Sequence, residues 1–266
     1  MRRLLRRGRS TEGSEDSVWI SFSDLMTSLL TIFMLAAVVL VLSLTQKQEA
    51  LASEQQRAEA QQRAFDETLG SLSEAEQVRA QMLVEIRDAL AAQGIDVTVS
   101  ADNSVLSIPT SLLGFEAGSY DIQPQHQQLA LTIGDTIAAV VARDDRYTYL
   151  DTVFVEGHTD NTPFEGLEGS GNWGLSTFRA ISLWRLWDER LAPDRQLDEL
   201  RREDGRTLFS VAGYGESRPA TETQVTDDER AANRRIDVRF TERRLSAEDL
   251  AAILDAEIAA RAEDGS

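Results

Sequence analysis

The only long apolar run in the sequence extends from residue 18 to residue 44, and an acid stands inside it: VWISFSDLMTSLLTIFMLAAVVLVLSL. A helix of roughly 20 apolar residues crosses a bilayer core of about 30 Å, so this stretch is long enough to span one. From Ile32 to Leu42 no residue is polar. Residues 18–44 are therefore predicted to form a transmembrane helix.

Asp24 is the exception in this segment, because a carboxylate in hydrocarbon costs roughly 2.5–3.5 kcal/mol even on mild insertion scales. Helical spacing predicts a polar stripe on its face, and such a stripe must contact a protein partner or water. Ionisable residues inside membranes are functional by default, so Asp24 is predicted to bind and release a cation. The alternative is an acid that only pairs with a neighbouring subunit. The hydroxyl residues of the stripe are Ser21, Thr27, Ser28 and Thr31.

Charge predicts the orientation of this helix. Arginines crowd the N-terminus, whereas the acids follow the apolar run. Short basic flanks stay in the cytoplasm, so residues 1–17 are predicted to be a cytoplasmic tail and everything after about residue 45 to lie outside. A cleaved signal peptide is the alternative. The apolar run is too long for that, and no small-residue cleavage site follows it cleanly.

Composition excludes several classes of function. The chain has 266 residues and no cysteine, which rules out disulfides and thiolate metal sites. Two histidines, His126 and His158, are too few for a histidine-rich metal site. A net charge of −18 argues against nucleic acid as a main partner. We expect neither a metal nor a cofactor.

Residues 45–94 are predicted to be a helical spacer, because they are rich in Gln, Glu, Ala and Arg and lack proline. Leu51, Ala58, Phe65 and Leu72 recur at seven-residue spacing, but the other seam positions are polar, so any coiled coil would be weak. A break is predicted at Gly70-Ser71. An amphipathic helix then follows and ends near Gly94, where its apolar positions are Met82, Leu83, Ile86 and Leu90.

Residues 95–241 are predicted to be an α+β or α/β domain, because helical and alternating patterns succeed one another there. Residues 242–266 are predicted to form an acidic C-terminal helix, with its apolar face between 246 and 262. The predicted strands are 96–100, 105–108, 148–156, 208–212 and 235–240, and the predicted helices are 125–142, 175–191 and 227–233.

The densest cluster of unusual residues is Glu156-Gly-His-Thr-Asp160, which ends a strand, and Gly171-Asn-Trp-Gly-Leu-Ser176, which begins a helix with Asn172 as its expected N-cap. Asp160 would bind an ammonium group and Arg179, one turn beyond Leu175, would clamp a carboxylate. The alternative is a structural Asp160–Arg179 ion pair, and spacing alone does not separate the two. No serine or cysteine nucleophile accompanies His158, so a hydrolase triad is not indicated.

The segment from Val155 to Trp184, VEGHTDNTPFEGLEGSGNWGLSTFRAISLW, resembles the OmpA C-terminal-like peptidoglycan-binding domain in the form found in MotB stator proteins. VAGYGESRP at 211–219 and NRRIDV at 233–238 also match, and the resemblance covers roughly residues 96–241. It implies a βαβ domain that grips the diaminopimelate of the cell-wall peptide. Many relatives have an aromatic residue before the motif asparagine, whereas this chain has Gly171 there and Trp173 after it. The implied binding residues are Thr159, Asp160, Asn172, Leu175 and Arg179.

The membrane segment supports a related resemblance. Trp19-Ile-Ser-Phe-Ser-Asp-Leu-Met-Thr27 resembles the single span of MotB proteins, and its SFSDLMT form is more similar to ZorB, the stator-like subunit of Zorya anti-phage systems. The resemblance implies a homodimeric B subunit of a motor driven by the proton motive force in the bacterial inner membrane. Two B subunits would sit in a ring of five MotA- or ZorA-like multi-span subunits. It also implies that the protein is not an enzyme. The alternatives are a flagellar stator subunit and a passive wall tether.

Overall fold

The computed structural model of the chain describes residues 12–202 and 204–243. The chain forms two compact units that divide between Ala64 and Phe65. Most of the basic tail and nearly all of the acidic helix predicted at 242–266 lie outside the described residues.

Helix α1 (Glu12–Ala91) is continuous through Gly70 and Ser71, so the break predicted there is wrong. Glycine inside a helix costs about 1 kcal/mol relative to alanine, which the strong helix formers on both sides can offset. The predicted end is confirmed, since α1 stops at Ala91 and Gly94 follows with a φ of +76°. That left-handed conformation suits glycine and terminates the helix.

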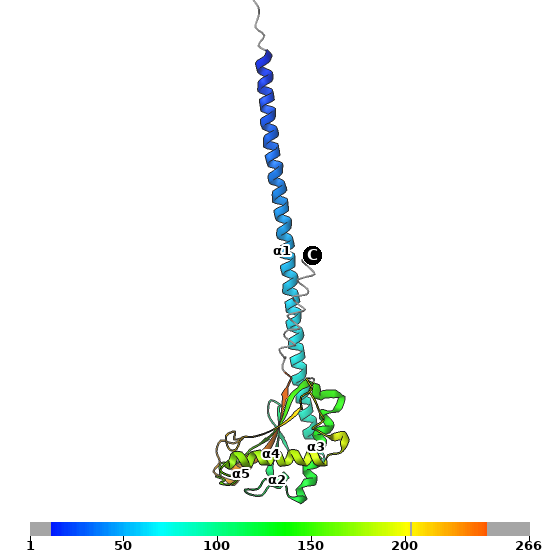
Figure 1. Cartoon of the computed structure of the whole chain (residues 1–266), viewed down its shortest axis with the longest axis vertical. Helices are drawn as coiled ribbons and strands as arrows, with labels where there is room; N and C mark the ends of the chain where they lie inside the picture. The colour runs from blue at the N-terminus through cyan, green and yellow to red at the C-terminus, as the bar shows by residue number, and fades with distance from the viewer. Residues whose placement is uncertain (1–11, 203, 244–266) are drawn as a thin grey trace, which may run out of the picture. The chain divides into compact units, whose positions relative to one another are not determined.

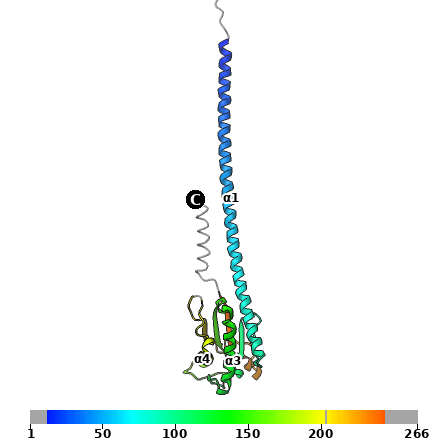
Figure 2. The same ribbon diagram turned by 90° about the vertical axis from the view of Figure 1, so that its right-hand side faces the viewer.

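The last turns of α1 belong to the core of the second unit. The four apolar positions between Met82 and Leu90 are fully buried and join one cluster with the strands and helices of the domain. Polar contacts fix the same turns from outside, because Glu85 accepts hydrogen bonds from Arg143 at 2.9 Å and Arg146 at 2.8 Å. Figure 2 shows this end of α1 beside the strands. The compact domain therefore includes residues that the sequence assigned to the spacer.

One five-stranded sheet, in the order β1-β2-β5-β3-β4, organises the domain. Only β3 and β4 are parallel, and the chain between them contains α4, which gives the predicted βαβ unit. The other neighbours are antiparallel, including β1 and β2, which lie close to the predicted strands at 96–100 and 105–108 and form a hairpin. This mixed sheet confirms the α+β class. The strands are β1 (Thr98–Val99), β2 (Val105–Pro109), β3 (Leu150–Gly157), β4 (Phe209–Gly213) and β5 (Arg235–Glu242).

The helices follow the apolar periodicity of the sequence. In α3, Ala130, Ile133 and Ile137 stand three or four positions apart and are fully buried, so one face of the helix lies in the core. In Figure 1, α4 runs across the strands and α3 lies close to it. The remaining elements are α2 (Thr110–Leu113), α3 (Pro124–Val141), η1 (Arg143–Tyr149), α4 (Gly171–Arg190), η2 (Pro193–Arg195) and α5 (Asp227–Asn233).

Helices α3 and α4 meet at Trp187, which is fully buried. Its Nε1 donates a 2.8 Å hydrogen bond to the carbonyl oxygen of Ala130. The indole fits because Gly134 lacks a side chain: a Cβ there would stand 2.5 Å from the Trp187 ring. This contact holds α4 in place, and α4 carries three of the five predicted binding residues of the domain.

The two faces of the sheet differ in polarity. On β3 and β5, Val155, Val238 and Phe240 are fully buried in the apolar core. Alternation places Glu156 and Asp237 on the opposite face, where they are also buried. The sheet thus separates an apolar core from a layer of charged side chains.

Candidate functional site

Among the described residues, α1 is the one helix long and apolar enough to cross a membrane, with a mean hydropathy of 2.7 over its best window. Its large apolar side chains between Trp19 and Leu44 are 48–76% exposed. Burying such side chains is worth about 1.5–3 kcal/mol each, so their surface requires lipid or another chain. An N-terminal apolar helix of this kind fits a single-pass inner-membrane protein.

Asp24 and the hydroxyl residues share one face of α1, since the segment is helical throughout. The Thr27 hydroxyl donates to the carbonyl oxygen of Ser23 at 2.7 Å, and the Thr31 hydroxyl donates to that of Thr27 at 2.8 Å. Their oxygens keep free acceptor capacity toward the outside of the helix. Within residues 12–202 and 204–243, no ion pair or hydrogen bond engages the Asp24 carboxylate.

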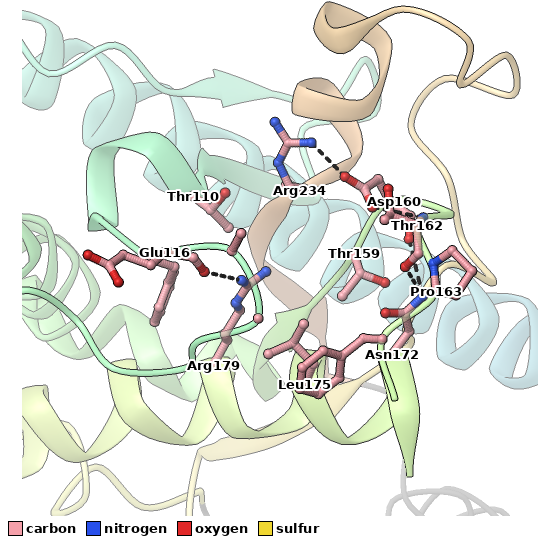
Figure 3. Close-up of a pocket in the computed structure, with 14 residues that line it drawn as sticks. Thr110, Glu116, Thr159, Asp160, Thr162, Pro163, Asn172, Leu175, Arg179 and Arg234 are labelled. Carbon is pink, nitrogen blue, oxygen red and sulfur yellow. Dashed lines mark hydrogen bonds and ion pairs between the residues drawn. The ribbon is translucent and has the colours of Figure 1, made fainter. Parts of the chain in front are cut away.

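A pocket of about 580 Å³ lies in the domain of the second unit, between the end of β3, the start of α4 and the loop after α2 (Figure 3). Two of the residues predicted to bind a ligand follow β3 and three lie on α4, and the fold brings all five to this pocket. They are Thr159, Asp160, Asn172, Leu175 and Arg179. Trp173 is 52% exposed and does not line the pocket.

Gly157 explains why the β3 loop and α4 come together. A Cβ on Gly157 would stand 1.9 Å from the carbonyl oxygen of Ser176, so only glycine permits this approach. The Ser176 hydroxyl also accepts a 2.9 Å hydrogen bond from the backbone N–H of Gly215. Because β3 and α4 lie so close, residues 159 and 160 face the first turns of the helix.

Asn172 does not cap α4, contrary to the prediction from the sequence. The helix starts at Gly171 with Ser170 before it, so Asn172 is already inside the first turn. Its Nδ2 instead donates to the carbonyl oxygen of Thr162 at 3.0 Å. The side chain therefore fixes the loop that carries Asp160 against the helix.

The sequence left open an Asp160–Arg179 ion pair, and the structure shows a different partner. The Asp160 carboxylate pairs with Arg234 Nη1 at 2.5 Å and accepts the Thr162 N–H at 3.0 Å. Burial would raise the pKa of Asp160, but the hydrogen bond from Arg234 and that of the Thr162 backbone outweigh it and hold the pKa below its usual value. Asp160 is thus a fixed negative charge at the pocket wall.

Arg179 lies on the other side of the pocket and is 3% exposed. Its Nε donates to the carbonyl oxygen of Ser119 at 2.8 Å, and its Nη2 donates to that of Glu116 at 2.9 Å (Figure 3). Burial and, to a smaller extent, the charge of Arg234 lower the pKa of Arg179, whereas the charge of Asp160 raises it, and the net result is a pKa of about 10. The guanidinium is therefore charged near neutral pH, and neutral carbonyls rather than an acid hold it.

Two further features support a ligand site here. The Thr159 hydroxyl is buried and has no hydrogen-bond partner within the described chain, although it borders the pocket. Buried polar groups normally find partners, so this oxygen is available to a bound molecule. The second feature is Arg234, which also lines the pocket and was not among the predicted binding residues, although it lies in the Asn233-Arg-Arg motif. Its position directly before β5 was the signal in the sequence that could have identified it.

A second cluster of buried charges occupies the polar face of the sheet. Candidate ligand atoms of Glu156, His158 and Asp237 all lie within 4.8 Å of one another. Arg239 donates to both oxygens of Glu156, at 3.1 and 3.0 Å, and Arg235 pairs with Asp237 at 2.9 Å. Two guanidinium groups already neutralise the carboxylates and would repel a metal ion, so we interpret this cluster as a structural network.

Burial alone would raise the pKa of Asp237, but the hydrogen bond with His158 and the charge of Arg235 hold it below its usual value. His158 Nε2 lies 3.2 Å from the Asp237 carboxylate, which fixes the ring beneath the pocket loop. This arrangement gives His158 a structural environment rather than that of a catalytic base.

Comparisons with known proteins agree on the class of the domain. Residues 114–234 match the model of the OmpA family. Motility protein B of Bacillus subtilis is 26% identical over 165 residues, which are 62% of this chain and 55% of that protein, so the match spans about half of the relative's length. The family model and the relative thus show that this part of the chain is similar to OmpA-family and MotB proteins.

Solved structures with a similar fold include a putative MotB-like protein from Desulfovibrio vulgaris, with a TM-score of 0.48 and 20% identity over 65% of this chain and 99% of that one. The cell wall anchor of the type VI secretion system (T6SS) from Pseudomonas aeruginosa has a TM-score of 0.43 and 23% identity, and the match covers 60% of this chain and 97% of that one. The periplasmic domain of Helicobacter pylori MotB has a TM-score of 0.41 and 21% identity, covering 57% and 85%.

Proposed function

We propose that this chain is the wall-anchored B subunit of an ion-driven motor in the bacterial inner membrane, with Asp24 as the carboxylate that carries the ion. The observation that carries this proposal is the position of Asp24. It lies on an uncovered apolar helix without a partner among the described residues. A helix that served only as an anchor would gain nothing from a charge that costs free energy in lipid.

The chemistry requires only one group that binds and releases a cation. A proton or sodium ion that enters from outside neutralises Asp24, and its release to the cytoplasm restores the charge. Each change alters how the helix packs against a neighbouring subunit. One charge that moves through 100 mV yields about 2.3 kcal/mol, so several ions per turn supply useful work. The oxygens of Thr27, Ser28 and Thr31 lie on the same face and would assist the transfer.

The outer domain would hold the motor in place by binding peptidoglycan. The side-chain end of diaminopimelate carries an ammonium and a carboxylate. Asp160 and the free Thr159 oxygen suit the first, and the charged Arg179 suits the second. Asn172 and Leu175 complete the wall of the pocket. The match to the OmpA family over residues 114–234 supports this assignment.

The assembly follows from the same proposal. The N-terminus lies in the cytoplasm and the outer domain in the periplasm. Two copies of the chain stand inside a ring of five multi-span A subunits, which face the Asp24 stripe. The SFSDLMT form of the span favours a Zorya-type defence motor. The similarity to Motility protein B favours the flagellar alternative, in which the same ion flow turns a rotor.

The test replaces Asp24 with Asn in cells that carry the matching A subunit. We expect phage protection, or motility in the flagellar case, to fall to background, whereas pull-down by isolated peptidoglycan stays at the wild-type level. Glu49→Gln removes an acid from the same helix beyond the apolar run and should leave both readouts unchanged. An Asp24→Asn variant that works like the wild type would replace the motor by a passive wall tether.

A further inference from the structure

Two carboxylates and two guanidinium groups line the pocket, but the Glu116 carboxylate points away from the arginines and accepts a hydrogen bond from Gln123 (Figure 3). The charged groups that face one another are those of Asp160, Arg179 and Arg234, which is one cation more than the Asp160–Arg234 ion pair uses. Asp160 Oδ2 is engaged by Arg234, and Arg179 is held by backbone carbonyls. Both neighbours act on Arg179 through space, since the charge of Asp160 raises its pKa and the charge of Arg234 lowers it. The two guanidinium groups are thus close enough to repel each other across the pocket that they line (Figure 3).

The side chain of Arg234 is held less firmly than those of Asp160 and Arg179. Its side chain is 38% exposed, against 10% for that of Asp160. Its backbone is fixed on both sides, because its N–H donates to Arg230 and its carbonyl oxygen accepts the Thr110 N–H at 3.0 Å. Movement is therefore confined to a long side chain at the mouth of the pocket.

We propose that Arg234 is the specificity-determining residue of this pocket. It pairs with Asp160 when the pocket is empty. When the ammonium group of a ligand pairs with Asp160 instead, Arg234 turns to the ligand's carboxylate. The inference rests on the proposed function and extends it to a residue outside the predicted set. A ligand with both charges exchanges one ion pair for two. A ligand with the ammonium alone must break the Asp160–Arg234 pair and leaves the guanidinium without a partner.

This exchange predicts selection against simple amines. An unpaired charge beside a buried, positively charged Arg179 is costly, whereas a carboxylate placed between the two arginines neutralises the excess charge. Two wall peptides provide suitable probes because they differ only in the group at issue. The side chain of the third residue ends in an ammonium and a carboxylate in L-Ala-γ-D-Glu-meso-diaminopimelate and in an ammonium alone in L-Ala-γ-D-Glu-L-Lys.

The experiment measures the affinity of both peptides for the full chain in detergent micelles by titration calorimetry. The wild type should prefer the diaminopimelate peptide by about tenfold or more. Arg234→Gln should weaken binding of the diaminopimelate peptide by about tenfold. Binding of the lysine peptide should stay equal or become tighter, because Arg234 no longer competes with its ammonium group for Asp160. Arg234→Lys, which keeps the charge but not the fork, should fall between the two.

The matched control is Arg185→Gln, which changes an exposed arginine of α4 outside the pocket and should alter neither affinity. Urea unfolding of each variant checks that the domain is folded. A parallel loss of both peptides in Arg234→Gln would overturn the proposal, since it would mean that Arg234 only maintains the shape of the pocket. Unchanged affinities would overturn it as well.

These outcomes are distinct from failure of the proposed function. If the wild type binds neither peptide, wall binding by this pocket is refuted and the role of Arg234 falls with it. If the wild type binds the diaminopimelate peptide and only the effect of Arg234→Gln is missing, wall binding stands and the exchange is refuted.

Discussion

Asp24 and Asp160 are both acids in positions where a charge is costly, but they differ in the partners of their carboxylates. Asp160 has Arg234 on one oxygen and the Thr162 N–H on the other. Asp24 has no such partner within the described residues, and the apolar side chains around it are exposed. The charged groups of the pocket have partners within the domain, whereas the exposed apolar side chains of α1 have no cover among the described residues.

This difference indicates a division of work between the two regions. A carboxylate held by its own fold keeps its charge and suits a binding site. A carboxylate without an internal partner gains its environment from an assembly and can change its charge there. If the two regions work separately, substitutions in one should leave the property of the other unchanged.

The largest effect is expected from Asp160→Ala, which removes the carboxylate and leaves two arginines without it. Loss of one partner from a buried charge pair costs about 2–5 kcal/mol, so binding to isolated peptidoglycan should weaken by roughly 30-fold or more. Sedimentation with purified wall fragments measures this. Arg179→Ala should act in the same direction. Retention of binding in both variants would mean that neither Asp160 nor Arg179 binds the wall peptide.

A second large effect is expected at the buried last turns of α1 and not at an exposed position in the middle of the helix. Ile86→Ala removes a fully buried side chain from the core and should lower the unfolding free energy of the domain by about 2–5 kcal/mol. Leu51→Ala, at a position that is 64% exposed, should change it by less than about 0.5 kcal/mol. Urea unfolding gives both values. Equal effects at the two sites would contradict the assignment of the end of α1 to the domain.

A smaller effect tests the continuity of α1. A Cβ on Gly70 would meet nothing within 4 Å, and the residue is helical. Gly70→Ala should therefore stabilise the helix by about 0.5–1 kcal/mol and raise the helical signal in circular dichroism. A decrease in helicity would support the break that the sequence suggested.

The smallest effect concerns pH. The pKa of Asp160 lies below its ordinary value of 3.8, so its charge is present above that value and is lost as the pH falls through the folded pKa. Arg179, with a pKa of about 10, stays protonated at neutral pH. Peptide binding should therefore be level between about pH 5 and 8 and decline below about pH 4. A steep change inside the level range would mean that another group controls the pocket.

Much of the fold followed from periodicity. The strands and the three longer helices of the domain lie close to their predicted positions, because alternating Val and Ile residues on β3 and β5 and the helical spacing in α3 are local signals. Continuity through Gly70 was not predicted, because a propensity cost of about 1 kcal/mol is small against a long run of helix formers. The burial of Met82 and Ile86 depends on contacts with a sheet that follows later in the chain.

The pocket was predicted in part. The spacing of Asp160, Leu175 and Arg179 placed them together, and the structure confirms that all three line one cavity. The partner of Asp160 was missed, since Arg234 lies 74 residues away in sequence. Asn172 was assigned a cap from its residue type, whereas its role depends on the loop carbonyl that the fold places beside it. Local patterns indicated the candidates, and distant pairing decided their roles.

The most direct test of the central claim is ion flux through the assembled motor. Purified complexes of the chain with its A-type partner are reconstituted in lipid vesicles, and proton or sodium uptake is recorded under an imposed membrane potential. The account predicts uptake for the wild type and for Asp160→Ala, and none above empty vesicles for Asp24→Asn. Uptake by Asp24→Asn at the wild-type rate would contradict it.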